Sequence, residues 1–305
     1  MNFVKRRWIA FNFILLALLF VLSPLAQENQ ILRAEQNDSG ISVYIGDSLF
    51  THYRILPDWK YPYFYPVNGP ASGLSLTTET SEPYPHHHSL FFGCDRVNGG
   101  NYWQEGLERG QIRSKTLKLT SSEGQRIVFE NECRWERPDA DPPFDDSRTI
   151  AISAPSPDLR FIDFTISLTA RMEVRIEKTN HSLFSARMVP ELSVLQGGTL
   201  INAEGLQAEK DTFGKPSPWC DYSGTRDGKV EGLAIFSHPQ NRWFPEPWFT
   251  RDYGFFSPTP MFWLKDDVCI LAKGEKITWR YRVVVHRGNA EEAKLALLYP
   301  DWIAH

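Results

Sequence analysis

Apolar and polar residues alternate with a period of two along most of this chain. Successive side chains of a β-strand point to opposite faces, so this alternation is typical of strands that bury one face. Turn residues such as Gly46-Asp47 and Ser122-Glu123-Gly124 separate the alternating stretches. The pattern therefore predicts an all-β fold, a single antiparallel β-sandwich. The alternating stretches are residues 40–55, 112–137, 161–176, 232–239 and 276–288.

Helical spacing occurs only in the tail NAEEAKLALLYPDW. It places Ala293, Leu297 and Leu298 on one face, which predicts a short C-terminal helix. The sequence contains no internal repeat and no clear linker, so residues 27–305 are predicted to form a single domain.

Three stretches lack the alternation. Residues 57–70 and 212–227 are rich in aromatic residues and proline, which predicts functional loops. Residues 137–148, RPDADPPFDDSR, are acidic and proline-rich, and we expect a solvated surface loop there.

The first 26 residues have the pattern of a secretory signal. Lys5, Arg6 and Arg7 precede an apolar run from Trp8 to Leu22, and a small-residue site ends at Ala26. An uncleaved anchor is the alternative. Cleavage predicts a periplasmic or secreted protein without stable membrane insertion, and the net charge of −4 gives no electrostatic reason to expect nucleic-acid binding.

The most unusual motif is YPHHHSLFFGCDRVNGGNYW, residues 84–103. If the run is extended, His86 and His88 share one face and could hold a divalent metal ion, while the other options are a general base at His86 or His87 and a loop in which imidazoles bond backbone groups. Asp95 could orient an imidazole, Asn98 precedes a turn, and Trp103 could stack on a ring. All three are candidates for substrate binding, as is Asp252 further along the chain.

A second candidate group lies in FSHPQNRWFPEPWFTRDYGFFSPTP, residues 236–260. Arg251 could clamp a carboxylate beside Asp252 and Tyr253. We expect this group and the histidine run to form one site. Further candidates for substrate binding are Asp221, Tyr222, His238, Trp248 and His286.

Four cysteines, Cys94, Cys133, Cys220 and Cys269, lie outside any CxxC pair, which argues against a structural zinc site. Export permits disulfides, but four thiols allow three pairings. A Walker loop, a Gly-x-Ser-x-Gly elbow and a His-Glu-x-x-His motif are all missing from the sequence.

The histidine motif resembles the Pro-His-His-(Arg)-Ser-Leu…Asp-Val-Asn-Gly…(Phe/Tyr)-Trp signature of an exported bacterial family labelled "methane oxygenase PmoA"-like, whose function was long unknown. The segments WCDYSGTRDGKVEGLAIFSHPQN, WFTRDYGFFSPTP and YRVVVHRG resemble later blocks of that family in the same order. His88 and Arg96 depart from the signature, so the resemblance favours His86 and His87. It implies a β-sandwich, of which the large mutarotase-like supersandwich is one form, and an association with polysaccharide degradation.

Taken together, these features predict a carbohydrate-processing enzyme. The expected activity is that of a carbon–oxygen lyase (dehydratase) that eliminates across a uronate or keto-sugar unit of an oligosaccharide, with His86 or His87 as base, Tyr253 as acid and Arg251 as clamp. One alternative is a glycan-binding module in which Tyr63, Tyr65, Trp103 and Trp248 stack on sugars. A glycoside hydrolase is another, although no convincing pair of carboxylates is visible.

Overall fold

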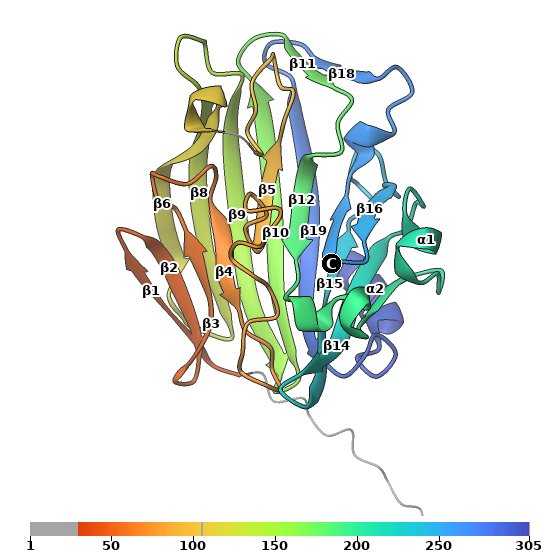
Figure 1. Ribbon diagram of the computed structural model, residues 1–305. Helices are drawn as coiled ribbons and strands as arrows, with labels where there is room; N and C mark the ends of the chain where they lie inside the picture. The colour runs from red at the N-terminus through yellow and green to blue at the C-terminus, as the bar shows by residue number, and fades with distance from the viewer. Residues whose placement is uncertain (1–29, 105, 305) are drawn as a thin grey trace, which may run out of the picture.

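The computed structural model describes residues 30–304 except residue 105, and the predicted signal segment lies outside them. Two antiparallel sheets stack face to face, with strands β1–β5 in one layer and β6, β8, β9, β10 and β19 in the other (Figure 1). The predicted antiparallel β-sandwich is thereby confirmed, as is the short C-terminal helix.

The first sheet has nine strands among the described residues. In spatial order they are β16 (Trp248–Arg251), β17 (Phe255–Pro258), β12 (Ser182–Arg187), β5 (Leu90–Cys94), β4 (Tyr63–Val67), β3 (Ser48–Arg54), β2 (Gly40–Ile45), β1 (Leu32–Asn37) and β7 (Glu123–Gly124).

The second sheet has eight strands within the same part of the chain. Their order is β13 (Thr199–Asn202), β14 (Trp219–Arg226), β15 (Lys229–Ser237), β19 (Lys276–Arg287), β10 (Leu159–Ala170), β9 (Phe144–Ser156), β8 (Arg126–Glu136) and β6 (Gln111–Ser121). A separate ribbon pairs β11 (Val174–Glu177) with β18 (Val268–Leu271).

The helices are few and short. Helix α1 spans Ala208–Thr212 and helix α2 spans Leu295–Ile303. The 3-10 turns are η1 (Leu107–Arg109), η2 (Pro190–Leu192), η3 (Val194–Gln196) and η4 (Pro260–Phe262). No helix in the described part of the chain is long and apolar enough to cross a membrane.

Aromatic rings from both sheets fill the space between them. Phe164 of β10 packs against Phe64, Phe92 and Phe184 of the opposite sheet, and Phe184 also stacks on Tyr281 at a centroid distance of 5.0 Å. This shared layer is the main core, and it explains the period-two pattern, since every second residue of the long strands enters it.

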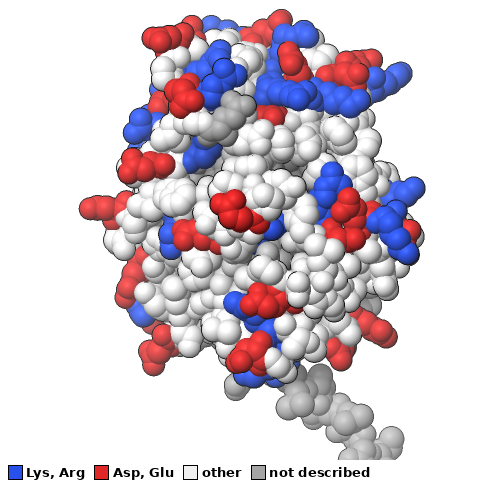
Figure 2. All heavy atoms as spheres, in the orientation of Figure 1, with Lys and Arg blue, Asp and Glu red and all other residues white. Residues whose placement is uncertain are grey.

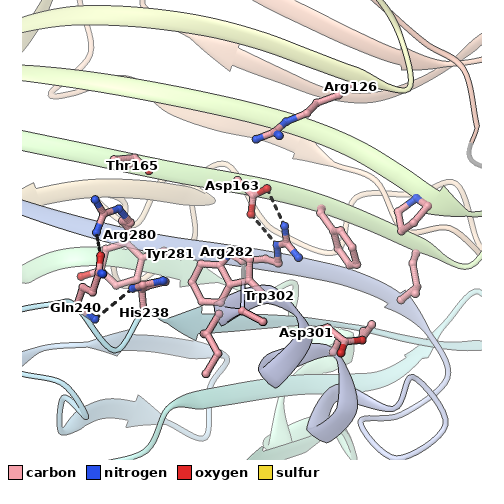
Figure 3. A pocket seen from close by; sticks show the side chains of 16 residues that line it. Arg126, Asp163, Thr165, His238, Gln240, Arg280, Tyr281, Arg282, Asp301 and Trp302 are labelled. Atoms are coloured by element: carbon pink, nitrogen blue, oxygen red, sulfur yellow. Dashed lines mark hydrogen bonds and ion pairs between the residues drawn. The ribbon is translucent and has the colours of Figure 1, made fainter.

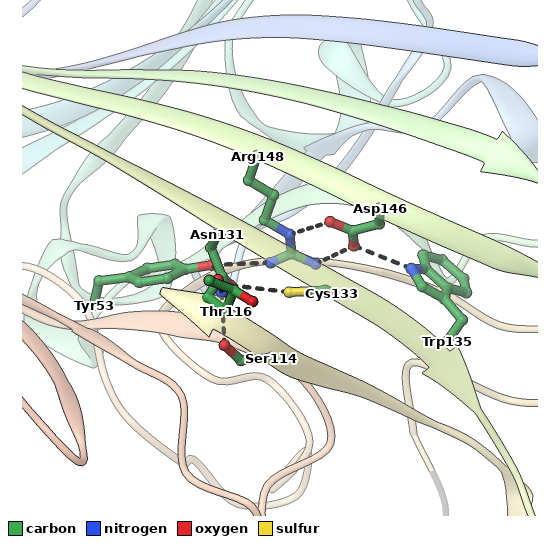
Figure 4. A network of polar contacts seen from close by, with 8 residues as sticks. All are labelled: Tyr53, Ser114, Thr116, Asn131, Cys133, Trp135, Asp146 and Arg148. Carbon is green, nitrogen blue, oxygen red and sulfur yellow. Dashed lines mark hydrogen bonds and ion pairs between the residues drawn. The ribbon is translucent and has the colours of Figure 1, made fainter. Parts of the chain in front are cut away.

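A buried polar network also crosses this core (Figure 4). The Nε and Nη2 atoms of Arg148 donate to both oxygens of Asp146 at 2.8 and 2.6 Å, and Nη1 donates to the Tyr53 hydroxyl at 3.3 Å. That hydroxyl donates in turn to Asn131 Oδ1 at 3.0 Å, and Trp135 Nε1 donates to Asp146 at 3.1 Å. Because Tyr53 belongs to β3 and Arg148 to β9, the network connects the two sheets.

Three expectations about irregular stretches were wrong. Residues 57–70 contain strand β4, residues 212–227 contain the whole of β14, and residues 137–148 run into β9. Burial in the tertiary structure, which the local sequence does not reveal, explains why these segments form strands. Asp146 and Arg148 read as solvated charges, yet they are 0% and 1% exposed because they neutralise each other inside the core.

The C-terminal helix begins later than expected and turns a different face to the sheet. Leu295 is fully buried, and Leu298 and Ala293 pack beside it against the outer side of the eight-stranded sheet. Leu297, predicted to lie on the apolar face, is 64% exposed. The helical phase starts at Leu295, after a left-handed residue at Lys294, and this shift carries Leu297 to the solvent side.

Candidate functional site

Two neighbouring strands, β5 and β12, position the candidate site. Phe92 and Phe184 point between the sheets, since each packs against Phe164. Side chains alternate along a strand, so Phe91 and Arg187 belong to the outer face of the nine-stranded sheet. The loops before and after β5 and the residue before β12 bring further polar groups to this outer face. Figure 2 shows that charged side chains gather at the top and the edges of the molecule, whereas the middle of the face in view is mostly uncharged.

The histidine run belongs to no strand, and His86 lies in a turn, so the strand-like alternation considered for the run does not occur. The His87 backbone N–H donates to the Tyr84 carbonyl at 3.1 Å, and the Tyr61 hydroxyl donates to the His86 carbonyl at 2.6 Å. As a result His86 lies beside His87, with ring centroids 4.5 Å apart, instead of sharing a face with His88.

His87 is held between aromatic rings. It stacks on Tyr84 at 5.2 Å and on Phe255 of β17 at 4.4 Å, and it is only 4% exposed. Packing on both faces fixes the direction of the imidazole, as a proton-transfer group requires.

A third histidine, His181, completes the cluster. Its ring centroid lies 6.1 Å from that of His86 and 6.0 Å from that of Trp103. Pairing of β5 with β12 brings His181 next to Asp95, whose Oδ2 lies 3.1 Å from its Nδ1. A carboxylate that accepts from Nδ1–H leaves the lone pair on Nε2, so the pair resembles an oriented general base.

Tyr253 joins the cluster from the second candidate segment. It stacks on Tyr84 at 5.0 Å, so the structure brings this part of the Arg251–Tyr253 loop beside the histidine run. The guanidinium carbon of Arg187 lies 4.4 Å from the centre of the Tyr253 ring, and its Nη2 donates to Ser81 Oγ at 3.0 Å.

Burial sets the protonation states in this cluster. Burial, together with the nearby His181 and His88, lowers the pKa of His86 to about 4. Burial, His86 and Arg187 lower the pKa of His87 to about 2. Burial and the neighbouring Tyr84 raise the pKa of Tyr253 to about 12. At neutral pH His86 and His87 are therefore neutral, and the Tyr253 phenol keeps its proton.

Several buried polar atoms of the cluster have no hydrogen-bond partner within the described residues. Buried donors and acceptors are nearly always paired in folded proteins, so a group of unpaired ones in one place indicates a bound molecule or solvent. The atoms are Asp95 Oδ1, Trp103 Nε1, His86 Nε2, His87 Nδ1 and the Nε and Nη1 atoms of Arg187.

His88 lies apart from these atoms. Its Nδ1 is 2.9 Å from the Glu79 carbonyl, and its ring packs against Trp59, Tyr61 and Tyr63. His86 and His88 thus do not face a common point, and no group of three or more His, Cys, Asp or Glu residues in the described chain is arranged to hold a metal ion. The predicted metal pair does not fit this geometry.

Arg251 and Asp252 engage helix α1 instead of the histidines. Arg251 Nη1 donates to Glu209 Oε1 at 2.5 Å, and its guanidinium lies over Phe213 and Phe249. Asp252 Oδ1 accepts from the Glu209 backbone N–H at 2.8 Å. Since Glu209 already neutralises Arg251, the cation that faces the cluster is Arg187.

The structure gives most of the other candidates internal partners. Asn98 bonds the backbone of Glu173 and Arg175, and Trp248 is fully buried and donates to the Ser217 carbonyl at 2.8 Å. Asp221 is buried in the eight-stranded sheet, with Oδ1 at 2.8 Å from Nε2 of His286. The Tyr222 hydroxyl donates to the Arg251 carbonyl.

His238 lines a different hollow, of about 690 Å³, on the side of the eight-stranded sheet that carries α2 (Figure 3). There its ring lies 5.3 Å from that of Trp302. Among the charged groups of this hollow, Arg282 forms a two-point pair with Asp163, and Arg280 donates to Gln240. It contains none of the other predicted site residues.

All four cysteines are free and buried in this structure. Burial, with Asp95 and Cys269 nearby, raises the pKa of the Cys94 thiol well above its usual value. Cys94 therefore remains a packed thiol at neutral pH.

Sequence inspection missed His181 and Arg187. Both lie at the ends of β12, a strand without a turn signal before it, and they reach the site only because β12 pairs with β5 across about 90 residues of chain. The available signal was the pair of polar residues, His181 and Arg187, that flank a short segment without charged side chains.

Comparison with solved structures finds only distant likeness. Galactose 1-epimerase from Lactobacillus acidophilus is 9% identical, with a TM-score of 0.39 over 87% of this chain and 100% of that chain. A galactose mutarotase related enzyme from the same species is 8% identical, with a TM-score of 0.36 over 85% and 98%. An α-galactosidase from Geobacillus stearothermophilus is 8% identical, with a TM-score of 0.35 over 84% of this chain, which spans only 41% of that enzyme.

These comparisons overturn one expectation. The enzymes named above are described as an epimerase, a mutarotase relative and an α-galactosidase, none of them a lyase, so the assignment to the carbon–oxygen lyases was wrong. No curated protein matches the chain. A family model does match, over residues 40–299, which include every residue of the histidine cluster. The chain therefore belongs to DUF6807, a family of unknown function.

Proposed function

We propose that this protein binds a saccharide at the histidine cluster and carries out acid–base chemistry on it. The observation that supports this proposal is the gathering of unpaired buried donors and acceptors around three imidazoles. The N-terminal signal pattern adds the proposal that the protein acts in the periplasm or outside the cell, where oligosaccharides from polysaccharide breakdown occur.

A saccharide matches this set of atoms because each sugar hydroxyl both donates and accepts a hydrogen bond. Asp95 Oδ1 is an acceptor, whereas Trp103 Nε1 and Arg187 are donors. The partly exposed rings of Tyr84 and Tyr253 offer an apolar surface next to these polar atoms. Binding sites generally combine apolar walls with a few converging polar groups.

The acid–base role follows from the histidines. His86 and His87 are neutral at physiological pH because burial lowers the pKa of each. His181 is 28% exposed, and Asp95 holds its Nδ1. We assign proton abstraction to His181, whose Nε2 is left free by the contact of Nδ1 with Asp95. The neutral His86 and His87 serve as hydrogen-bonding groups for the sugar, and Tyr253, whose phenol remains protonated, is the proton donor.

The two alternative functions are less well supported. A binding module was expected to stack sugars on Tyr63, Tyr65, Trp103 and Trp248, but three of these rings are fully buried and Tyr65 alone among the four is partly exposed. A glycoside hydrolase commonly needs two carboxylates, and the described cluster contains one, Asp95.

The test is a turnover assay with a panel of neutral and acidic oligosaccharides, in which proton NMR follows both anomeric interconversion and product formation. Replacing His181 by Ala should lower turnover by about 10²–10⁴-fold with the circular-dichroism spectrum unchanged. Replacing His86 or His87 by Ala should weaken saccharide binding. His52→Ala is the control, since His52 bonds Ser42 in the β2–β3 hairpin, outside the cluster. Saccharide binding without turnover would show a binding module instead, and no saccharide binding at all would refute the proposal.

A further inference from the structure

Arg187 is a buried cation without an acidic partner. Its side chain is on the outer face of β12, it is 4% exposed, and it forms no ion pair within the described part of the chain. The ionisable groups whose charges would act on it are three phenols, those of Tyr253, Tyr222 and Tyr84, and phenols are neutral at pH 7.

Arg148, a second buried arginine, has an acidic partner inside the protein and serves as a comparison. Arg148 is 1% exposed and both of its bonds to Asp146 are direct and short. An isolated buried charge is strongly unfavourable unless it is paired. Arg148 satisfies that requirement within the protein, whereas Arg187 leaves Nε and Nη1 unpaired.

We infer that Arg187 is the receptor for an anionic group, so that the saccharide bound at the histidine cluster carries a carboxylate. This inference rests on the function proposed above. A guanidinium bonds carboxylates through several N–H groups at once, and the unpaired atoms of Arg187 are suitable donors for that purpose.

The position of Arg187 places it beside the histidines. Arg187 and His181 stand at opposite ends of β12, and both lie close enough to His87 to lower its pKa. His86 lies between His87 and His181, with ring centroids 4.5 Å from the first and 6.1 Å from the second. A ligand bound at the histidines is therefore also near Arg187.

Access to Arg187 passes its aromatic neighbours. Tyr253 lies over the guanidinium and Tyr84 stacks on Tyr253, and both rings are partly exposed. A carboxylate that bonds Arg187 must therefore displace these two rings from the guanidinium.

The test measures binding by titration calorimetry with the full-length protein and three matched ligands: a uronate oligosaccharide, its carboxyl-reduced neutral analogue and a sulfated analogue. Wild-type protein should prefer the uronate. Arg187→Met should weaken uronate binding by about 10- to 100-fold and leave binding of the neutral analogue within about twofold. Arg187→Lys should retain part of the preference.

Arg282→Met is the matched control, because Arg282 is paired with Asp163 on the other sheet. Equal affinity of wild-type protein for the acidic and neutral ligands would overturn the inference while leaving the proposed function intact. If the wild-type protein prefers the sulfated analogue and Arg187→Met loses that preference, then Arg187 binds a sulfate group instead of a carboxylate. Failure of all three ligands to bind would refute the proposed function itself.

Discussion

At the residue scale, Arg187 and Arg148 make opposite contributions to stability. Removing Arg187 removes a buried charge whose partners are the Tyr253 ring and the Ser81 hydroxyl and not a carboxylate. Arg187→Met should therefore raise the free energy of unfolding of the ligand-free protein, by about 1–4 kcal/mol. Urea denaturation measures this, with Arg282→Met as a reference. A destabilised Arg187→Met protein would mean that the charge is compensated in the folded state.

The buried histidines give a pH dependence whose sign can be stated. The pKa of His87 is about 2 in the folded protein and about 6.5 when unfolded, so below pH 6.5 the unfolded chain binds a proton that the folded state does not. Stability should fall as the pH decreases from 6.5, by at most about 1.4 kcal/mol per pH unit for this residue.

His87→Phe removes the group that titrates and keeps an aromatic ring between Tyr84 and Phe255. We expect a shallower loss of stability between pH 6.5 and 4.5 than in the wild type, measured by urea denaturation at several pH values. His86 contributes in the same direction down to its pKa of about 4, so some slope remains. An unchanged slope in His87→Phe would contradict the lowered pKa of His87 in the folded protein.

At the scale of elements, helix α2 covers part of the outer side of the eight-stranded sheet with one of its faces. Leu295 is fully buried against Phe161, Phe236 and Val284, while Leu297, two positions on, is 64% exposed. Leu295→Ala should cost about 2–5 kcal/mol of stability, whereas Leu297→Ala should change it by less than about 0.5 kcal/mol. Thermal denaturation of both variants measures the difference, and similar effects would contradict the observed phase of the helix.

The long strands could be predicted from the sequence, and the short ones could not. β10 and β19 alternate over about twelve residues, and each repeat strengthens the signal. β5 and β12 are buried on both faces, so their sequences do not alternate at all. The aromatic and proline content of residues 57–70 obscured β4 in the same way.

The candidate site was predictable only in part for the same reason. The histidine run and Tyr253 were visible as motifs, because rare residue types stood together. The partners of the run, His181 and Arg187, flank a strand that gives no periodic signal, and Arg251 looked like the cation until Glu209 of α1 was seen to neutralise it. Strand pairing, which decides these contacts, is not encoded in any short stretch.

At the scale of the whole molecule, the network of Figure 4 fixes the two sheets relative to each other. Arg148→Met leaves Asp146 charged and buried, so it should cost about 3–5 kcal/mol. The double replacement Asp146→Leu with Arg148→Met should be less harmful than the single one, because no charge then remains. Arg134→Met is the control, since Arg134 pairs with Asp145 at the surface and should cost about 1 kcal/mol or less. Urea denaturation gives all three values, and a double variant less stable than Arg148→Met would contradict this account.

The cluster joins residues from Tyr84 to Phe255, and this separation has a consequence during translation. A ribosome that adds about 5–20 residues per second needs roughly 10–30 s to proceed from His86 to Phe255. During that time the nascent chain acquires Trp103 and later the edge of β12, both before the strand β17 that contacts them. Until β17 has emerged, a newly made chain therefore leaves this edge of the sheet unpaired.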